Sequence, residues 1–412
     1  MLGGCGKEEG GRTEIRLWAM GAEGEHVRSF IPEFERRHPG ITVNAQIVPW
    51  TAAHEKLLTA YAGGSMPDVF QLGNTWIPEF SALSALEDLG PFVRRSSVVN
   101  DTSYFPGIWQ TNLMDSVLYG VPWYVDTRVM FYRTDILARA GYPRGPRTWE
   151  QLLDASRKIV GKPDGKHYAL LLPSNEWAAP VLFGMQEHSA LLRDNNTYGN
   201  FEGPEFSRAF HFLNTFYHEQ LSPLGISQVV NVYQGFAEGF FALYITGPWN
   251  IGEFLRRIPP AQQDAWMTSP LPAPDSASWP GVSLAGGSSL VIFSGSRHKE
   301  AAWQLIEYMS EPERQVAFYK VTGDLPARLE SWNDSTLATN AYVKAFYTQL
   351  NHVMPAPKIP EWEQITVKIQ DYSELASRNP GTIDETLRML DRDVNQILEK
   401  RRWIMARKGD GQ

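Results

Sequence analysis

The first 75 residues alternate between two hydrophobic patterns. Every second residue is apolar over 41–47, and short apolar runs occur at 15–18 and 68–72, so three strands are predicted. Between them, apolar residues recur at i, i+3, i+4 and i+7 over 27–34, and a second helical stripe covers 57–61, so two core-facing helices are predicted. This β-α-β-α-β order is typical of a parallel sheet with right-handed crossovers.

Polar and aromatic side chains follow the carboxyl ends of these three strands, at 18–25, 49–50 and 73–76. Open parallel sheets bind ligands at that edge, so we expect a ligand-binding surface there. Its candidate residues are Asn74 and Trp76.

A second α/β unit is predicted further along the chain. Thr148 and Gln151 have the spacing of a capping box, and apolar runs at 168–172 and 239–245 indicate strands. Pro204 opens a helix, because proline is favoured in the first helical turn. The apolar stripe of that helix comprises Phe206, Ala209, Phe210, Leu213 and Tyr217. The C-terminal part of the chain is mostly helical in pattern.

Length and composition limit the class of protein. The 412 residues exceed one compact core, which favours two or three domains. A formal net charge of -8 argues against nucleic-acid binding, which needs a clustered basic face. No run of 18 or more apolar residues occurs, so no membrane-spanning helix is expected.

Cys5 is the only cysteine, so no intrachain disulfide is possible. The context Leu2-Gly3-Gly4-Cys5-Gly6 resembles the lipobox at which bacterial lipoprotein precursors are cleaved and acylated. The apolar stretch that should precede a lipobox is absent, so the start looks truncated, and residues 1–11 are expected to form a leader and polar tether. A chance cysteine in a flexible leader is the alternative.

Motifs of the common catalytic classes are absent. The chain has no Gly-x-Ser-x-Gly, no Walker A loop and no His-Glu-x-x-His, and its nine histidines are scattered. A carboxylate pair for glycoside hydrolysis has no fixed sequence spacing, so a glycoside-active enzyme stays an alternative.

The segment 120–135 combines aromatic rings, the carboxylate Asp126 and the guanidinium of Arg128. Such a combination suits a sugar, because one face of a pyranose stacks on Trp or Tyr while its hydroxyls need fixed donors and acceptors. Asp126 could accept two sugar hydroxyls, or it could instead form a salt bridge with Arg128.

Nine motifs occur in one order along nearly the whole chain. They are His38-Pro39-Gly40-Ile-Thr-Val43, Ala62-Gly-Gly-Ser-Met-Pro67-Asp68-Val, Asn74-Thr-Trp76, Leu86-Glu-Asp-Leu89, Tyr119-Gly-Val-Pro122, Tyr132-Arg-Thr-Asp135, Pro146-Arg-Thr-Trp149-Glu150, Gly247-Pro-Trp-Asn250 and Leu325-Pro-Ala-Arg328. In this ordered set the chain resembles a family 1 extracellular solute-binding protein of a carbohydrate ABC transporter, close to the maltose/trehalose-binding branch.

The resemblance implies an α/β, two-lobe periplasmic binding protein fold of type II-like topology, with a ligand cleft between the lobes. The N-terminal lobe would comprise 12–125 and 288–325, and the C-terminal lobe 126–287 and 326–412. Closure of such lobes over a sugar excludes water and strengthens each hydrogen bond.

The resemblance also implies which side chains bind the ligand. The candidates from the crossing segments and family motifs are Asp126, Tyr124, Trp249, Arg328, Gly286, Gly287 and Ser288, and the resemblance adds Glu23, Trp50, Trp177 and Trp362. Some relatives have Trp where this chain has Ser288, and several have Asp near Asn74, so this chain would lack one stacking platform and suit a shifted pattern of sugar hydroxyls.

The function implied is that of a sugar receptor, in the periplasm or lipid-anchored to the cell envelope of a bacterium. It would bind a di- or oligosaccharide, deliver it to the permease subunits of an ABC importer, act as a monomer, need no cofactor or metal and catalyse no reaction. The alternatives are a glycoside-active enzyme and the same fold binding a non-sugar solute.

Overall fold

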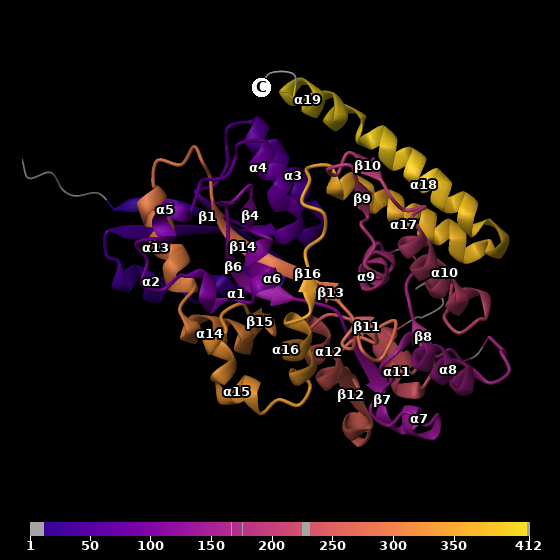
Figure 1. The fold of residues 1–412 in the computed structure, drawn as a ribbon. Helices are drawn as coiled ribbons and strands as arrows, with labels where there is room; N and C mark the ends of the chain where they lie inside the picture. The colour runs from indigo at the N-terminus through magenta and orange to yellow at the C-terminus, as the bar shows by residue number, and fades with distance from the viewer. Residues whose placement is uncertain (1–11, 166, 175, 225–230, 410–412) are drawn as a thin grey trace, which may run out of the picture. The chain divides into compact units, whose positions relative to one another are not determined.

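The computed structural model describes residues 12–165, 167–174, 176–224 and 231–409, and the chain divides into two compact units (Figure 1). Unit 1 comprises the described residues up to Tyr104, together with Asn112–Tyr124 and Ser288–Ser331. Unit 2 comprises Phe105–Thr111, Val125–Gly287 and the described residues from Trp332 onwards.

The division differs from the expected lobes at three places. Residues 105–111 and Val125, expected in the N-terminal lobe, belong to unit 2, and residues 326–331, expected in the C-terminal lobe, belong to unit 1. The latter stay with unit 1 because the strand at Leu325–Pro326 and the backbone of Arg328 and Leu329 bond to its residues. The expected leader, with Cys5, lies outside the described residues.

Unit 1 is built on a six-stranded sheet of order β15-β6-β14-β3-β1-β2. Its strands are β1 (Thr13–Met20), β2 (Ile41–Val48), β3 (Val69–Gly73), β6 (Val121–Asp126), β14 (Gly286–Ile292) and β15 (Leu325–Pro326). β1 pairs with β2 and with β3 in parallel, so the predicted parallel arrangement of these three strands is confirmed. β14 pairs antiparallel with β3. A short hairpin joins β4 (Leu113–Met114) and β5 (Val117–Leu118).

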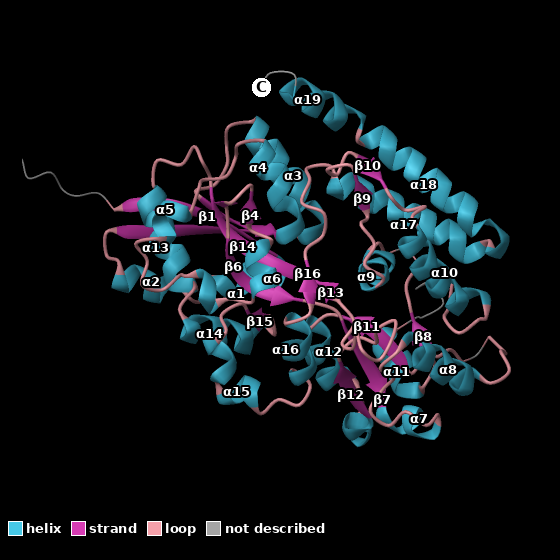
Figure 2. Cartoon of the chain, in the orientation of Figure 1, coloured by secondary structure: helices cyan, strands magenta, loops and turns pink. Residues whose placement is uncertain are grey.

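The helices of unit 1 pack around this sheet (Figure 2). They are α1 (Gly21–Val27), α2 (Ile31–Arg37), α3 (Trp50–Ala62), α4 (Ile77–Ala82), α5 (Gly90–Val93), α13 (Lys299–Met309) and α14 (Pro312–Thr322). The single helix predicted over 27–34 is wrong, because the chain turns between α1 and α2. Pro32, in the first turn of α2, cannot continue a helix from α1, since its ring would clash with the preceding turn.

Unit 2 is built on a four-stranded sheet of order β12-β7-β11-β8. Its strands are β7 (Val129–Arg133), β8 (Leu170–Leu171), β11 (Leu243–Thr246) and β12 (Trp266–Ser269), and two further pairs join β9 (Leu192–Arg193) to β10 (Tyr198–Gly199) and β13 (Ser283–Leu284) to β16 (Val353–Met354). Its helices are α6 (Pro106–Gln110), α7 (Thr134–Arg139), α8 (Trp149–Val160), α9 (Ala178–Gln186), α10 (Pro204–His218), α11 (Val232–Glu238), α12 (Trp249–Arg257), α15 (Ser335–Ala338), α16 (Lys344–Leu350), α17 (Trp362–Arg378), α18 (Ile383–Ile397) and α19 (Glu399–Gly409).

Two helix starts that the sequence predicted in unit 2 are confirmed. Thr148 caps α8, its hydroxyl oxygen accepting from the backbone N–H of Gln151 at 3.2 Å. The Gln151 side chain accepts instead from the backbone N–H of Arg147 (2.9 Å). α10 begins at Pro204 as predicted, and all five residues of its apolar stripe are buried.

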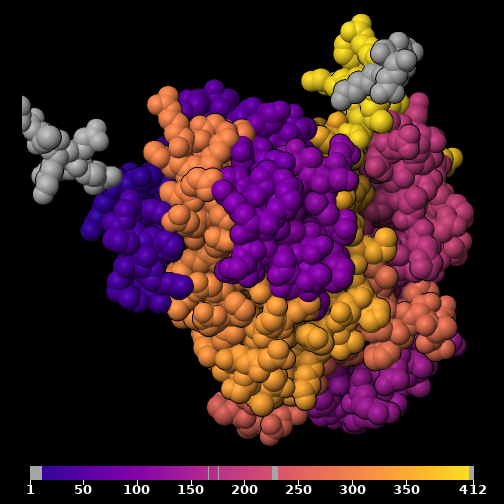
Figure 3. Space-filling model, turned by 60° about the vertical axis from the view of Figure 1, so that its left-hand side comes forward, coloured from indigo at the N-terminus to yellow at the C-terminus, as the bar shows by residue number. Residues whose placement is uncertain are grey.

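The C-terminal helix α19 carries the exposed side chains of Trp403, Ile404 and Met405, and Figure 3 shows this end of the chain in yellow at the surface. Among the described residues no helix is both long and apolar enough to span a bilayer.

Candidate functional site

Glu23 lies just after the carboxyl end of β1, in the short helix α1, and it is 8% exposed. The Tyr124 hydroxyl donates to Glu23 Oε1 at 2.8 Å, and Trp50 Nε1 donates to Glu23 Oε2 at 3.2 Å. Gly21 makes this approach possible: its φ is +48°, and a Cβ there would lie 2.7 Å from the Trp50 ring. The structure therefore brings three predicted candidates together within unit 1.

Trp50 belongs to an aromatic group at the same edge of unit 1. Its ring centroid lies 5.9 Å from that of Trp76 in an edge-to-face arrangement, and the His54 ring lies 5.0 Å from Trp76. His54 Nε2 in turn contacts Glu79 Oε2 at 2.6 Å. Trp50 is 37% exposed, so its ring is accessible to a ligand.

Asn74 and Ser288 are almost fully buried, and their oxygens are used inside unit 1. The Ser289 hydroxyl donates to Asn74 Oδ1 at 3.0 Å, whereas Asn74 Nδ2 has no hydrogen-bond partner. Ser288 Oγ accepts from Gln71 Nε2 at 3.3 Å. A ligand role for these two residues stays a prediction.

Tyr124 is buried and keeps its proton. Burial raises the pKa of its hydroxyl well above the ordinary value, and the negative charge of Glu23 raises it further. The phenol is therefore neutral at physiological pH and acts as a donor to Glu23 rather than as an exposed stacking surface.

In unit 2, Asp126, Arg128 and Trp249 form a second group. Arg128 Nη1 lies 3.1 Å from Asp126 Oδ1, and the guanidinium carbon lies 4.7 Å from the centroid of the Trp249 ring. Trp249 begins α12, three residues after β11, and is 43% exposed. Ser283 fixes the backbone of Arg128, bonding its N–H (3.1 Å) and its carbonyl oxygen (3.0 Å). The salt bridge considered for Asp126 is therefore present.

Gly286 and Gly287 have separate reasons to be glycine. A Cβ on Gly286 would collide with the Asp126 carboxylate, and Gly287 has a φ of +119°, which L side chains rarely adopt. These facts explain the glycines through the fold, while direct ligand contact remains a prediction.

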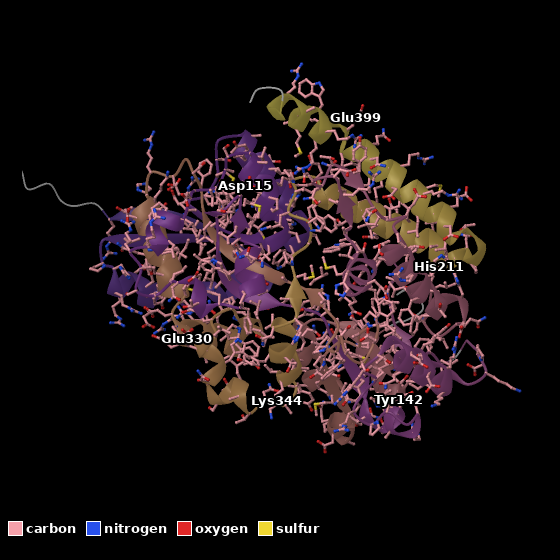
Figure 4. The ribbon with its side chains drawn as sticks, viewed as in Figure 1. Asp115, Tyr142, His211, Glu330, Lys344 and Glu399 are labelled. Carbon is pink, nitrogen blue, oxygen red and sulfur yellow. The ribbon has the colours of Figure 1, made fainter. Side chains whose placement is uncertain are left out.

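Arg328 is not available to a ligand, so this expectation is wrong. Its guanidinium is buried in unit 1 and donates to the carbonyl oxygens of Val98 (2.6 Å) and Ser310 (3.1 Å) and to the carboxylate of Glu330 (3.1 Å), which is labelled in Figure 4. A buried cation requires such partners, and they occupy N–H groups of the guanidinium that a ligand would need.

The expectation that Trp362 binds the ligand is also wrong. It is fully buried in a hydrophobic core of unit 2, among side chains of α9, α10, α17 and α18. Trp177 packs edge-to-face against it with ring centroids 6.0 Å apart and is only half-buried, so a ligand role for Trp177 stays a prediction.

The scattered histidines include two on α10 that have ordinary partners. His211, labelled in Figure 4, lies 2.8 Å from Asp384 Oδ1, and His218 Nε2 lies 3.1 Å from the Ala376 carbonyl oxygen. Within the described part of the chain, no group of three His, Cys, Asp or Glu side chains could hold a metal ion.

Sequence reasoning missed Gln71, His54 and Glu79. His54 lies one helical turn after Trp50 on α3, a spacing visible in the sequence, but Gln71 lies within a buried strand and gives no sequence signal.

Comparison with known proteins decides the family. The model of the bacterial extracellular solute-binding protein family matches residues 21–316, well over half of the chain. The chain belongs to this family. The expectation of a carbohydrate solute-binding protein of family 1 is thereby confirmed, and so is its two-lobe periplasmic binding protein fold.

Relatives of this solute-binding protein include solved and curated proteins. The sugar-binding protein MalE of the phytopathogen Xanthomonas citri is 46% identical, with a TM-score of 0.92, over 96% of this chain and 99% of that one. The galactooligosaccharide-binding protein of Bacillus subtilis is 24% identical over 88% of this chain and 86% of its own. The diacetylchitobiose binding protein DasA of Streptomyces coelicolor is 26% identical over 78% and 74%. The family and these relatives are binding proteins rather than enzymes.

Proposed function

We propose that this solute-binding protein captures a di- or oligosaccharide, with maltose and trehalose as the first candidates, and delivers it to the permease subunits of an ABC importer. The observation that carries the proposal is that each unit has an accessible tryptophan grouped with a carboxylate, through a direct hydrogen bond in unit 1 and through Arg128 in unit 2. These are Trp50 with Glu23 in unit 1 and Trp249 with Asp126 in unit 2.

This chemistry matches what a pyranose presents. The indole face of an accessible tryptophan stacks on the apolar CH face of the ring, and an ionised carboxylate accepts hydrogen bonds from hydroxyls. Sugar-binding and oligosaccharide-binding names among the relatives support the same ligand class.

The decisive experiment is a thermal-shift screen of the purified protein against maltose, trehalose, sucrose, cellobiose, maltotriose and glucose, followed by calorimetry on each hit. A ligand that binds the folded state raises the unfolding midpoint by mass action. A shift with an unchanged sugar after overnight incubation supports a receptor, and consumption of the sugar supports the glycoside-active alternative. No shift with any saccharide would direct attention to a non-sugar solute.

We also propose that the receptor is a monomer, needs no cofactor, and works in the periplasm or anchored to the envelope by a lipid on Cys5. The extracellular family supports an exported protein. Mass spectrometry of the membrane fraction, with Cys5→Ser as control, tests the anchor, since an unmodified wild-type Cys5 would contradict it. Light scattering tests the monomer.

A further inference from the structure

Gln71 is a fully buried glutamine in the middle of β3, and its amide contacts three other segments of unit 1. Its Oε1 accepts from the backbone N–H of Met20 at 2.7 Å, at the end of β1. Its Nε2 donates to the Tyr124 hydroxyl oxygen at 3.1 Å and to Ser288 Oγ at 3.3 Å. Tyr124 and Ser288 are the residues of unit 1 next to two of the points where the chain passes between units.

The orientation of this amide follows from its partners. A backbone N–H can only donate, so the oxygen of Gln71 must face Met20 and the amide nitrogen must face Tyr124. The nitrogen also can only donate, so the Tyr124 oxygen acts as an acceptor there. The hydroxyl hydrogen is thus left for Glu23, whose Oε1 lies 2.8 Å away.

We infer that Gln71 is a positioning residue for ligand binding. It turns the Tyr124 hydroxyl into a dedicated donor to Glu23 and thereby holds that carboxylate in one orientation beside the accessible ring of Trp50. Gln71 itself, being fully buried, touches no ligand. The inference rests on the proposed function only in so far as Glu23 and Trp50 contact the sugar.

Two substitutions of Gln71 separate polarity from packing. Gln71→Met keeps the approximate volume and removes the amide. Gln71→Glu keeps the shape and the acceptor for Met20 but replaces the donor with a second acceptor, to which the Tyr124 hydrogen can turn. The matched control is Gln315→Met: Gln315 is also buried in unit 1, but its amide contacts the backbone of Arg328 and Pro122.

The first readout needs no ligand. The indole N–H resonance of Trp50 reports its hydrogen bond to Glu23, and it is assigned by comparison with Trp50→Phe in a ¹⁵N-labelled spectrum. We expect both Gln71 variants to shift this resonance in the direction that Tyr124→Phe shifts it, and Gln315→Met to leave it in place. An unmoved resonance in a folded Gln71→Glu protein would overturn the inference, and so would an equal shift in the control.

The second readout is a double-mutant cycle of affinity for maltose and trehalose by calorimetry. We expect Gln71→Met to weaken binding about tenfold in the wild type but less than about twofold in a Glu23→Gln background, because the effect passes through Glu23. Equal losses in both backgrounds would overturn the inference. If the wild type binds neither sugar, the maltose/trehalose part of the proposed function fails, and the indole resonance still decides the role of Gln71.

Discussion

Each unit groups a carboxylate with an accessible tryptophan, but the two carboxylates have different surroundings. In unit 1, Glu23 is nearly buried and receives hydrogen bonds from two neutral donors, Tyr124 and Trp50. In unit 2, Asp126 is partly exposed and pairs with the cation Arg128, which lies over the ring of Trp249. Neutral donors orient a carboxylate without cancelling its charge, whereas a partly exposed ion pair contributes little and is screened by salt. We therefore expect the group around Glu23 in unit 1 to be the more rigid and the group around Asp126 in unit 2 to be the more adaptable.

The largest expected effect on folding comes from removing the buried carboxylate. Glu23→Ala leaves the Tyr124 hydroxyl and Trp50 Nε1 without their acceptor, so we expect the free energy of unfolding to fall by about 1–3 kcal/mol. Urea denaturation measures it, with Glu25→Ala as control, because Glu25 is exposed on the same helix. Equal stability of the two variants would contradict the claim that Glu23 is more firmly held in unit 1 than Asp126 is in unit 2.

The partly exposed group of unit 2 is expected to affect binding more than folding. Trp249→Ala and Asp126→Ala should each weaken saccharide binding by about 1–3 kcal/mol, through lost stacking or lost charge-assisted hydrogen bonds. Calorimetry tests this against Trp403→Ala, since Trp403 is an exposed tryptophan of unit 2 on α19. Unchanged affinity in both variants would refute the site in unit 2 but not the family.

Alkaline pH should affect unit 1 through Tyr124. Its pKa in the folded protein is raised by burial and by Glu23, above the ordinary value of about 10. The folded protein thus holds the phenol proton more tightly than the unfolded chain does. The contribution of the neutral Tyr124 to the unfolding free energy is therefore fully present below about pH 10 and is lost as pH rises from there through the folded pKa. Between pH 10 and 11, the unfolding free energy of Tyr124→Phe should fall less steeply than that of the wild type, by at most about 1.4 kcal/mol per pH unit. Identical slopes would contradict the burial of the phenol.

The smallest expected effect concerns the ion pair of unit 2. Arg128→Gln should change the unfolding free energy by about 0.5 kcal/mol at low salt and by less in 0.5 M NaCl, because Asp126 and Arg128 are both partly exposed. Denaturation at the two salt concentrations measures it. A loss above about 2 kcal/mol, insensitive to salt, would mean that the pair is as rigid as the hydrogen-bonded Glu23.

Local patterns of the sequence determined several elements correctly. The cap at Thr148 and the buried stripe of α10 follow from patterns within one element, and the parallel pairing of β1, β2 and β3 follows from the alternation of strands and helices along the first 75 residues. The ordered motifs also identified the family, because they extend along almost the whole chain. Even the wrong helix over 27–34 has a local cause, since Pro32 is visible in the sequence.

Only the tertiary structure decided which side chains are free to meet a ligand. Arg328 and Trp362 match family motifs or aromatic patterns. In the structure, however, the guanidinium of Arg328 donates to buried carbonyl oxygens, and the ring of Trp362 is buried in a hydrophobic core. Glu23 bonds to partners 27 and 101 residues away, and Gln71 reaches one 217 residues away. Periodicity reports which face of an element is buried, but a contact between distant segments depends on how the strands are ordered in the sheet, and the spacing of residues along the chain does not contain that order.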